Sequence, residues 1–88
     1  MTTEVATVNE TWTNLTTGLS LTNGQIYLLS NNGSRRVYIN EQASAPTGDP
    51  EGHILNPQEK IQYTQRSGLT LFAITVYGEA TVAATEAN

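Results

Sequence analysis

The sequence contains no cysteine, which excludes a disulfide framework, a thiolate metal site and a cysteine nucleophile. Basic residues are also scarce: four Lys and Arg stand against eight Asp and Glu, which gives a net charge of −4. A nucleic-acid-binding protein needs a basic face to displace counterions from phosphates, and an anionic membrane attracts the same kind of face. We therefore expect neither nucleic acid nor a membrane as a partner.

Long hydrophobic runs are missing as well. The longest apolar-rich stretch, Leu69–Tyr77, has the length of a strand and falls far short of the roughly 20 residues of a membrane helix. The first residues, Met1–Val8, lack the basic start and the apolar core of a signal peptide. We therefore expect synthesis in a cytoplasm.

Motifs for catalysis and cofactor binding are not found. The single histidine, His53, follows the loop Glu41–Gly52 and has no nucleophile-elbow motif near it. The glycines match no phosphate-binding pattern, so we expect no enzyme and no cofactor. Asp49, Glu51 and His53 alternate and have the right chemistry to hold a divalent cation. Pro50 and Gly52 mark a turn there, and a solvated loop or an intersubunit hydrogen bond is the simpler interpretation, so we expect no metal.

The residues that are abundant favour strands. Threonine is the commonest residue, and glycines and prolines interrupt the chain at the spacing of a hairpin protein. The alternating pattern predicts strands at Glu4–Val8, Thr11–Leu15, Gln25–Ser30, Ser34–Asn40, His53–Leu55, Gln58–Thr64, Leu69–Tyr77 and Ala80–Ala84. We expect one all-β domain over residues 1–88, a small antiparallel β-sandwich or barrel of about six to eight strands. Residues 1–9 are expected as a possible extended arm and residues 85–88 as a frayed tail.

A hairpin is the clearest local prediction. Asn31-Asn32-Gly33 connects the strands Gln25–Ser30 and Ser34–Asn40, and an Asn-Gly pair favours a tight turn. Both faces of this hairpin are partly apolar, which fits a central position or contact with a second chain. Strand alternation places Arg35 and Arg36 on opposite faces, so we do not expect them to form one patch. Either a solvated flank or a contact with an acidic partner fits them.

Aromatic residues raise the alternative of a glycan site. Trp12 with Tyr27, Tyr38, Tyr63 and Tyr77 would suit a platform for a sugar ring, although aromatic side chains on sheets pack more often in cores or subunit interfaces. A small carbohydrate-binding or host-receptor-binding module therefore stays open as an alternative function.

Hydrophobic alternations with a few glycines and prolines between them follow a recognisable order: Leu19–Asn31 around Asn23-Gly24, Arg36–Ile39, a loop ending near Ala45-Pro46, His53–Pro57 and Leu71–Ile74. In this order, over most of its length, the chain resembles small β-structured virion proteins of tailed bacteriophages, of the capsid decoration or cement type.

The resemblance implies a non-enzymatic protein of the virion that binds the capsid exterior as a dimer or trimer. Its partners would be itself and the major capsid protein, and a fibre, neck or tail position is the alternative. The contact segments would be Thr2–Val8, which could lie along the shell as an added strand, and the loop Glu41–Gly52. The candidate partner-contact residues are Thr2, Thr3, Glu4, Val5, Arg35, Arg36, Asp49 and His53.

Overall fold

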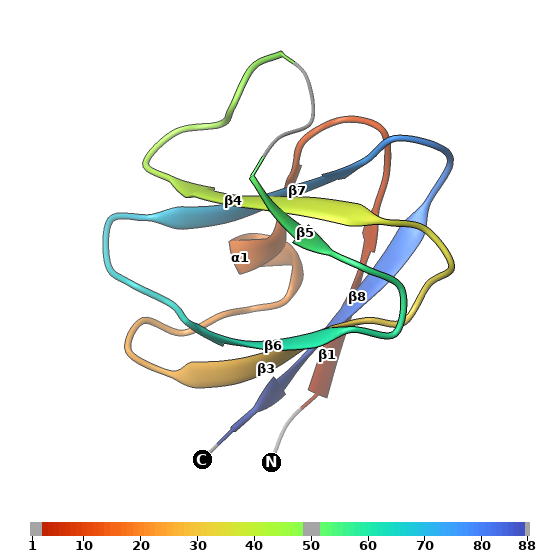
Figure 1. The fold of residues 1–88 in the computed structure, drawn as a ribbon. Helices are drawn as coiled ribbons and strands as arrows, with labels where there is room; N and C mark the ends of the chain where they lie inside the picture. Colours follow the sequence, from red (N-terminus) through yellow and green to blue (C-terminus); the bar gives the residue numbers. More distant parts are fainter. Residues whose placement is uncertain (1–2, 49–51, 88) are drawn as a thin grey trace.

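The computed structural model describes residues 3–48 and 52–87, which form eight strands and one short helix (Figure 1). Among these residues, no helix is long and apolar enough to cross a membrane. In chain order the elements are β1 (Thr3–Val8), β2 (Thr13–Asn14), α1 (Leu15–Gly18), β3 (Ile26–Asn31), β4 (Val37–Gln42), β5 (His53–Leu55), β6 (Lys60–Thr64), β7 (Thr70–Thr75) and β8 (Ala80–Glu86).

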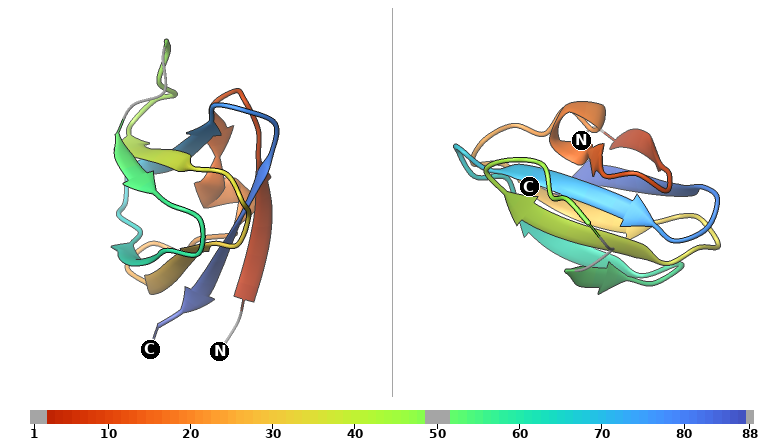
Figure 2. Two further views of the ribbon diagram at one scale, coloured as in Figure 1. Left: turned by 45° about the vertical axis from the view of Figure 1, so that its right-hand side comes forward. Right: turned by 90° about the horizontal axis from the view of Figure 1, so that it is seen from above.

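The strands form two four-stranded antiparallel sheets that pack as a sandwich. Sheet A has the strand order β1-β8-β3-β6, and sheet B has the order β2-β7-β4-β5. The two sheets face each other in Figure 2, with α1 at one open side. The predicted fold class is therefore confirmed as a sandwich, with a strand count at the upper end of the expected range.

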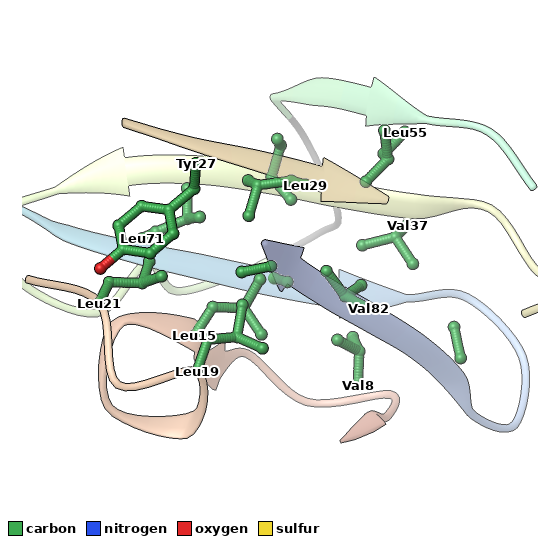
Figure 3. Packing of buried hydrophobic residues seen from close by; sticks show 14 residues of the cluster. Val8, Leu15, Leu19, Leu21, Tyr27, Leu29, Val37, Leu55, Leu71 and Val82 are labelled. Atoms are coloured by element: carbon green, nitrogen blue, oxygen red, sulfur yellow. The ribbon is translucent and has the colours of Figure 1, made fainter. Parts of the chain in front are cut away.

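Because side chains alternate along a strand, every second side chain points into the space between the two sheets. The side chains that meet there are aliphatic, with Tyr27 as the one buried aromatic member of this cluster (Figure 3). The larger members are Val8, Leu15, Leu19, Leu21, Leu29, Val37, Ile39, Leu55, Leu71 and Val82. In β6 the predicted inward residues Ile61 and Tyr63 pack against this core, while Lys60 and Gln62 are exposed, as predicted.

The segment predicted as the strand Thr11–Leu15 is mostly not a strand. Only Thr13 and Asn14 pair with β7, and the chain then turns into α1. The Asn14 side chain caps this helix by accepting a hydrogen bond from the Thr17 N–H at 3.0 Å. Four residues are too few to produce a visible helical period, so the sequence pattern did not reveal the helix. The helix directs Leu15 into the core.

The predicted hairpin between residues 25 and 40 is wrong. β3 pairs with β6 and β8 in sheet A, whereas β4 pairs with β5 and β7 in sheet B, so residues 32–36 cross from one sheet to the other. The reason is the side chain of Asn31, which is fully buried. It donates to the carbonyl oxygens of Arg35 at 2.7 Å and Leu55 at 2.9 Å, and it accepts from the Gly33 N–H at 3.0 Å. These bonds turn the chain between the sheets.

Residues 3–8 and 85–86 are also more ordered than expected. Residues 3–8 are not an extended arm, because β1 pairs with β8 along its whole length, from Thr3–Thr85 to Val8–Ala80, and Val8 is fully buried. The expected frayed tail is corrected in the same way, since Thr85 and Glu86 belong to β8. β1 begins beside the end of β8, so both ends of the domain lie at one end of sheet A (Figure 1).

Candidate binding site

The outward face of sheet B combines aromatic and aliphatic side chains with uncharged polar ones. Tyr38 lies in register between Ile74 of β7 and Ile54 of β5, and Phe72 lies opposite Asn40. Because Leu71, Ala73, Val37 and Ile39 face the core, these neighbours at alternate positions face outward. Ile54 is 38 % exposed, whereas Phe72 and Ile74 are buried although they lie on this face. The strand positions on this face include no charged residue, and Arg36 directly precedes β4.

A pocket of about 460 Å³ lies at one end of this face. One wall comes from the start of β4 and the residues before it: Ser34, Arg35, Arg36 and Tyr38. The other wall is Thr75, the last residue of β7, with Val76 and Tyr77. Val37, the first residue of β4, is paired with Thr75, the last residue of β7. The segment that enters β4 and the segment that leaves β7 therefore lie side by side at this end of the sheet.

Hydrogen bonds fix the backbone of both walls. Thr75 is buried, and its hydroxyl donates to the carbonyl oxygen of Arg36 at 2.9 Å, which ties one wall to the other. The carbonyl oxygen of Arg35 accepts from the buried Asn31 side chain. Beyond Tyr77, the Gly78 N–H donates to a carboxylate oxygen of Glu10 at 2.7 Å, which anchors the turn after β7. The pocket is therefore formed in advance by the fold.

Positive charge is concentrated at this pocket. Arg35 and Arg36 are two of the four basic residues of the chain, and both side chains are exposed. Within residues 3–48 and 52–87 the one ion pair is between Arg66 and Glu41, so neither pocket arginine is paired with a carboxylate there. Arg36 Nη1 lies 3.5 Å from the hydroxyl oxygen of Tyr38, a long contact that leaves most of the guanidinium's donors available.

A second, smaller cavity of about 330 Å³ opens between the sheets on the side of β5 and β6. Core residues Ile39 and Leu71 form its apolar floor, while Glu41, His53 and Tyr63 bring polar groups to it. The Tyr63 hydroxyl donates to a carboxylate oxygen of Glu41 at 2.8 Å. Burial raises the pKa of this hydroxyl far above its ordinary value, and the hydrogen bond to Glu41 acts in the same direction.

This second cavity borders a polar network that joins the two sheets, and the network accounts for two of its polar groups, those of Glu41 and Tyr63. Gln65 is buried; its amide nitrogen donates to the Leu69 carbonyl at 2.7 Å, and its amide oxygen accepts from the Thr16 hydroxyl at 3.0 Å. The Thr16 hydroxyl in turn accepts from the Leu71 N–H at 2.8 Å. Since Glu41 also binds Arg66, the polar atoms are used in holding α1, β4, β6 and β7 together.

The candidate partner-contact residues do not form one site. Thr3, Glu4 and Val5 lie on the edge strand β1 of sheet A, with Val5 57 % exposed. His53 lies at the second cavity, in sheet B. Thr2 and Asp49 lie outside the described residues, as does Glu51 of the possible cation set. Among the described residues, no group of three His, Cys, Asp or Glu side chains has a geometry for a metal ion.

Arg35 and Arg36, in contrast, are brought together. The expectation that they do not form one patch is wrong, because both line the pocket. Arg35 lies in the irregular crossover before β4, where strand alternation does not apply. Ser34, Thr75 and Val76 were not predicted for a site, and only knowledge of the crossover would have placed them beside the arginines.

The aromatic residues are divided among several places. Tyr27 is buried in the core and Tyr63 is in the polar network, so they share no platform with the others. Trp12 is half-buried, and its ring N–H is buried without a hydrogen-bond partner among the described residues. Tyr38 and Tyr77 line the pocket, with Tyr77 69 % exposed. The five-residue platform is therefore reduced to two rings.

Comparison of the chain with protein-family models, with curated proteins and with solved structures gave no match, so its function has to be argued from the geometry of these surfaces.

Proposed function

We propose that this protein is a non-enzymatic structural component of a phage virion, a head decoration protein that binds the capsid exterior as an oligomer. The single observation that carries the proposal is the lack of charge on the faces of the sandwich. Among the outward positions of the described strands, only Lys60 in β6 is charged, although the whole chain carries twelve charged side chains. The cores of protein interfaces are depleted of charge in the same way.

Sheet A supplies the capsid-facing surface in this proposal. Its outer face carries threonines 3, 7, 64, 81 and 85 together with small and aliphatic residues, and Val5 and Leu28 are exposed. The one charge on this face, Lys60, lies with Gln62 on β6, at the edge opposite β1. β1 is the edge strand of this sheet, so a strand from a neighbouring subunit could pair with it. Several such contacts in one oligomer would act together and raise the effective affinity through avidity.

Copy number tests the assignment to the head. Quantitative mass spectrometry of purified particles from the source should find this protein at a number comparable to that of the major capsid protein. A dozen or so copies would assign it to the neck, tail or fibres instead, and complete absence from the particles would overturn the virion assignment.

The contact surface is tested with single added charges rather than with a deletion of β1, which would remove a core residue, Val8. Val5→Lys should lower occupancy on stripped capsids at least tenfold, because it places a charge on the part of the outer face of sheet A that β1, β8 and β3 form, which carries none. Ile54→Lys adds the same charge to sheet B, and Ser44→Lys adds it to an exposed loop; both should bind as the unchanged protein does. Equal binding by Val5→Lys would refute sheet A as the contact.

A further inference from the structure

The pocket at the end of sheet B has a chemistry that the proposed capsid contact does not use. We propose that it binds an acidic sugar, a pyranose ring that carries a carboxylate. The pocket belongs to sheet B, on the other side of the sandwich from the face proposed for the capsid, so both surfaces can be occupied at once.

The charge of the ligand follows from Arg35 and Arg36. Each guanidinium offers several N–H donors in a planar fork, and such a fork binds a carboxylate through two parallel hydrogen bonds. In the described part of the chain no carboxylate neutralises either arginine, even though acidic residues outnumber basic ones two to one in the sequence. Two unpaired cations in one depression of an acidic protein indicate an anionic ligand.

The rings indicate that the anion is carried by a sugar. Tyr38 and Tyr77 bring aromatic surface and hydroxyl groups to the same pocket, and Ser34 and Val76 add a hydroxyl and an apolar contact. A pyranose has matching parts, because its C–H face packs on an aromatic ring while its hydroxyls form hydrogen bonds. A glutamate side chain of a protein partner would use the arginines alone and would leave the exposed Tyr77 ring without a role.

The size and rigidity of the pocket suit a small ligand. Its volume of about 460 Å³ lies within the range of roughly 300–1,000 Å³ that is common for small-molecule sites. The hydrogen bonds of Thr75 to the Arg36 carbonyl and of Asn31 to the Arg35 carbonyl hold the backbone on which both arginines are mounted. Such preorganisation reduces the ordering cost of binding.

The test is an NMR titration of the full, uniformly ¹⁵N-labelled chain with D-glucuronate and with N-acetylneuraminate. At least one of the two should give saturable shifts of the backbone amides of residues 34–38 and 75–77. D-Glucose keeps the ring and lacks the carboxylate of glucuronate, whereas triglutamate has carboxylates and no sugar ring; both should bind at least tenfold more weakly. If neither acidic sugar shifts these amides, the proposal is refuted.

Four variants assign the interactions. Arg35→Gln and Arg36→Gln should each weaken binding of the acidic sugar about tenfold, and both arginines are exposed, so the fold should be retained. Lys60→Gln removes the same charge from β6 and should change the affinity less than twofold. Tyr77→Ala should weaken binding of the sugar and leave triglutamate unaffected.

One result would indicate that the pocket binds an acidic protein partner instead of a sugar. If triglutamate binds as tightly as the sugars and Tyr77→Ala has no effect, the pocket recognises carboxylates only, and the sugar proposal is overturned. The capsid assignment is measured separately, by copy number and by Val5→Lys, so either proposal can fail without the other.

Discussion

Replacing Asn31 with alanine should be among the most damaging single changes in this protein. The side chain is fully buried at the point where the chain crosses between the sheets. It makes three hydrogen bonds, to the Arg35 carbonyl, the Leu55 carbonyl and the Gly33 N–H, with lengths of 2.7, 2.9 and 3.0 Å. Alanine removes all three bonds and leaves these backbone groups without that partner.

The magnitude follows from the number of bonds. A buried hydrogen bond contributes about 1 kcal/mol net, so we expect the free energy of unfolding to fall by about 3 kcal/mol. Domains of this size are stable by only about 4–13 kcal/mol. For a small domain the loss corresponds to a decrease in Tm of roughly 12–24 °C. Thermal unfolding followed by far-UV circular dichroism, together with urea titration, measures both quantities.

Two further variants make the result specific. Asn32→Ala changes the neighbouring exposed residue and should alter the stability by less than about 0.5 kcal/mol. Asn31→Asp keeps an acceptor for Gly33 but turns carboxylate oxygen toward two carbonyl oxygens, so at pH 7 it should destabilise more than alanine does. If Asn31→Ala unfolds within about 1 kcal/mol of the unchanged protein, the crossover does not depend on this side chain and our explanation is wrong.

Three other outcomes are expected. Gly52→Ala should destabilise the fold by more than about 2 kcal/mol in urea titration, because a Cβ there would lie 2.3 Å from the Ile39 carbonyl oxygen. Gly24→Ala is the control: a Cβ there would have no atom within 4 Å, so the change should cost only about 1 kcal/mol of backbone strain at φ +84°. The Tyr63 hydroxyl has a raised pKa in the fold, so its contribution to stability is complete below about pH 10 and is lost as the pH rises further. Between about pH 9 and 11.5, Tyr63→Phe should therefore lose less stability in urea titration than the unchanged protein does. Trp12→Phe should cost less than about 1.5 kcal/mol by the same titration, since the lost packing is offset by removal of a buried N–H without a partner among the described residues; a loss above about 3 kcal/mol would mean that this N–H is bonded in solution.

Much of the fold could be predicted because alternation is a local signal. The inward and outward residues of β6 follow from the pattern, and so does the apolar character of both faces of β7, where Leu71 to Thr75 are all buried. The hairpin prediction was wrong because the turn preference of Asn31-Asn32-Gly33 is local, whereas tertiary packing decides which strands β3 and β4 pair with. Asn31 satisfies its side chain only when the crossover and the end of β5 come together.

The candidate site was less accessible to sequence reasoning. Arg35 and Arg36 are conspicuous as a pair, but their shared place at the pocket depends on the irregular crossover, and Tyr77 joins them from the segment that follows β7. The polar network beside the second cavity could not be predicted either, because it too depends on tertiary packing. Thr16, Glu41 and Gln65 are far apart in the sequence and ordinary in type, and only the packed sandwich shows that they share hydrogen bonds.

The antiparallel pairing of β1 with β8 gives the domain a useful polarity for engineering. Thr3 is paired with Thr85 at one end of the two strands, while Val8 is paired with Ala80 at the other. The pocket residues Val76 and Tyr77 come shortly before Ala80, so they lie at the end remote from the termini, about 20 Å away along a six-residue strand. A short linker could therefore join the two ends of the domain in a circular permutant with new termini elsewhere. In the unpermuted chain, an affinity tag or solid support attached at these ends would leave the arginine pocket facing the solution.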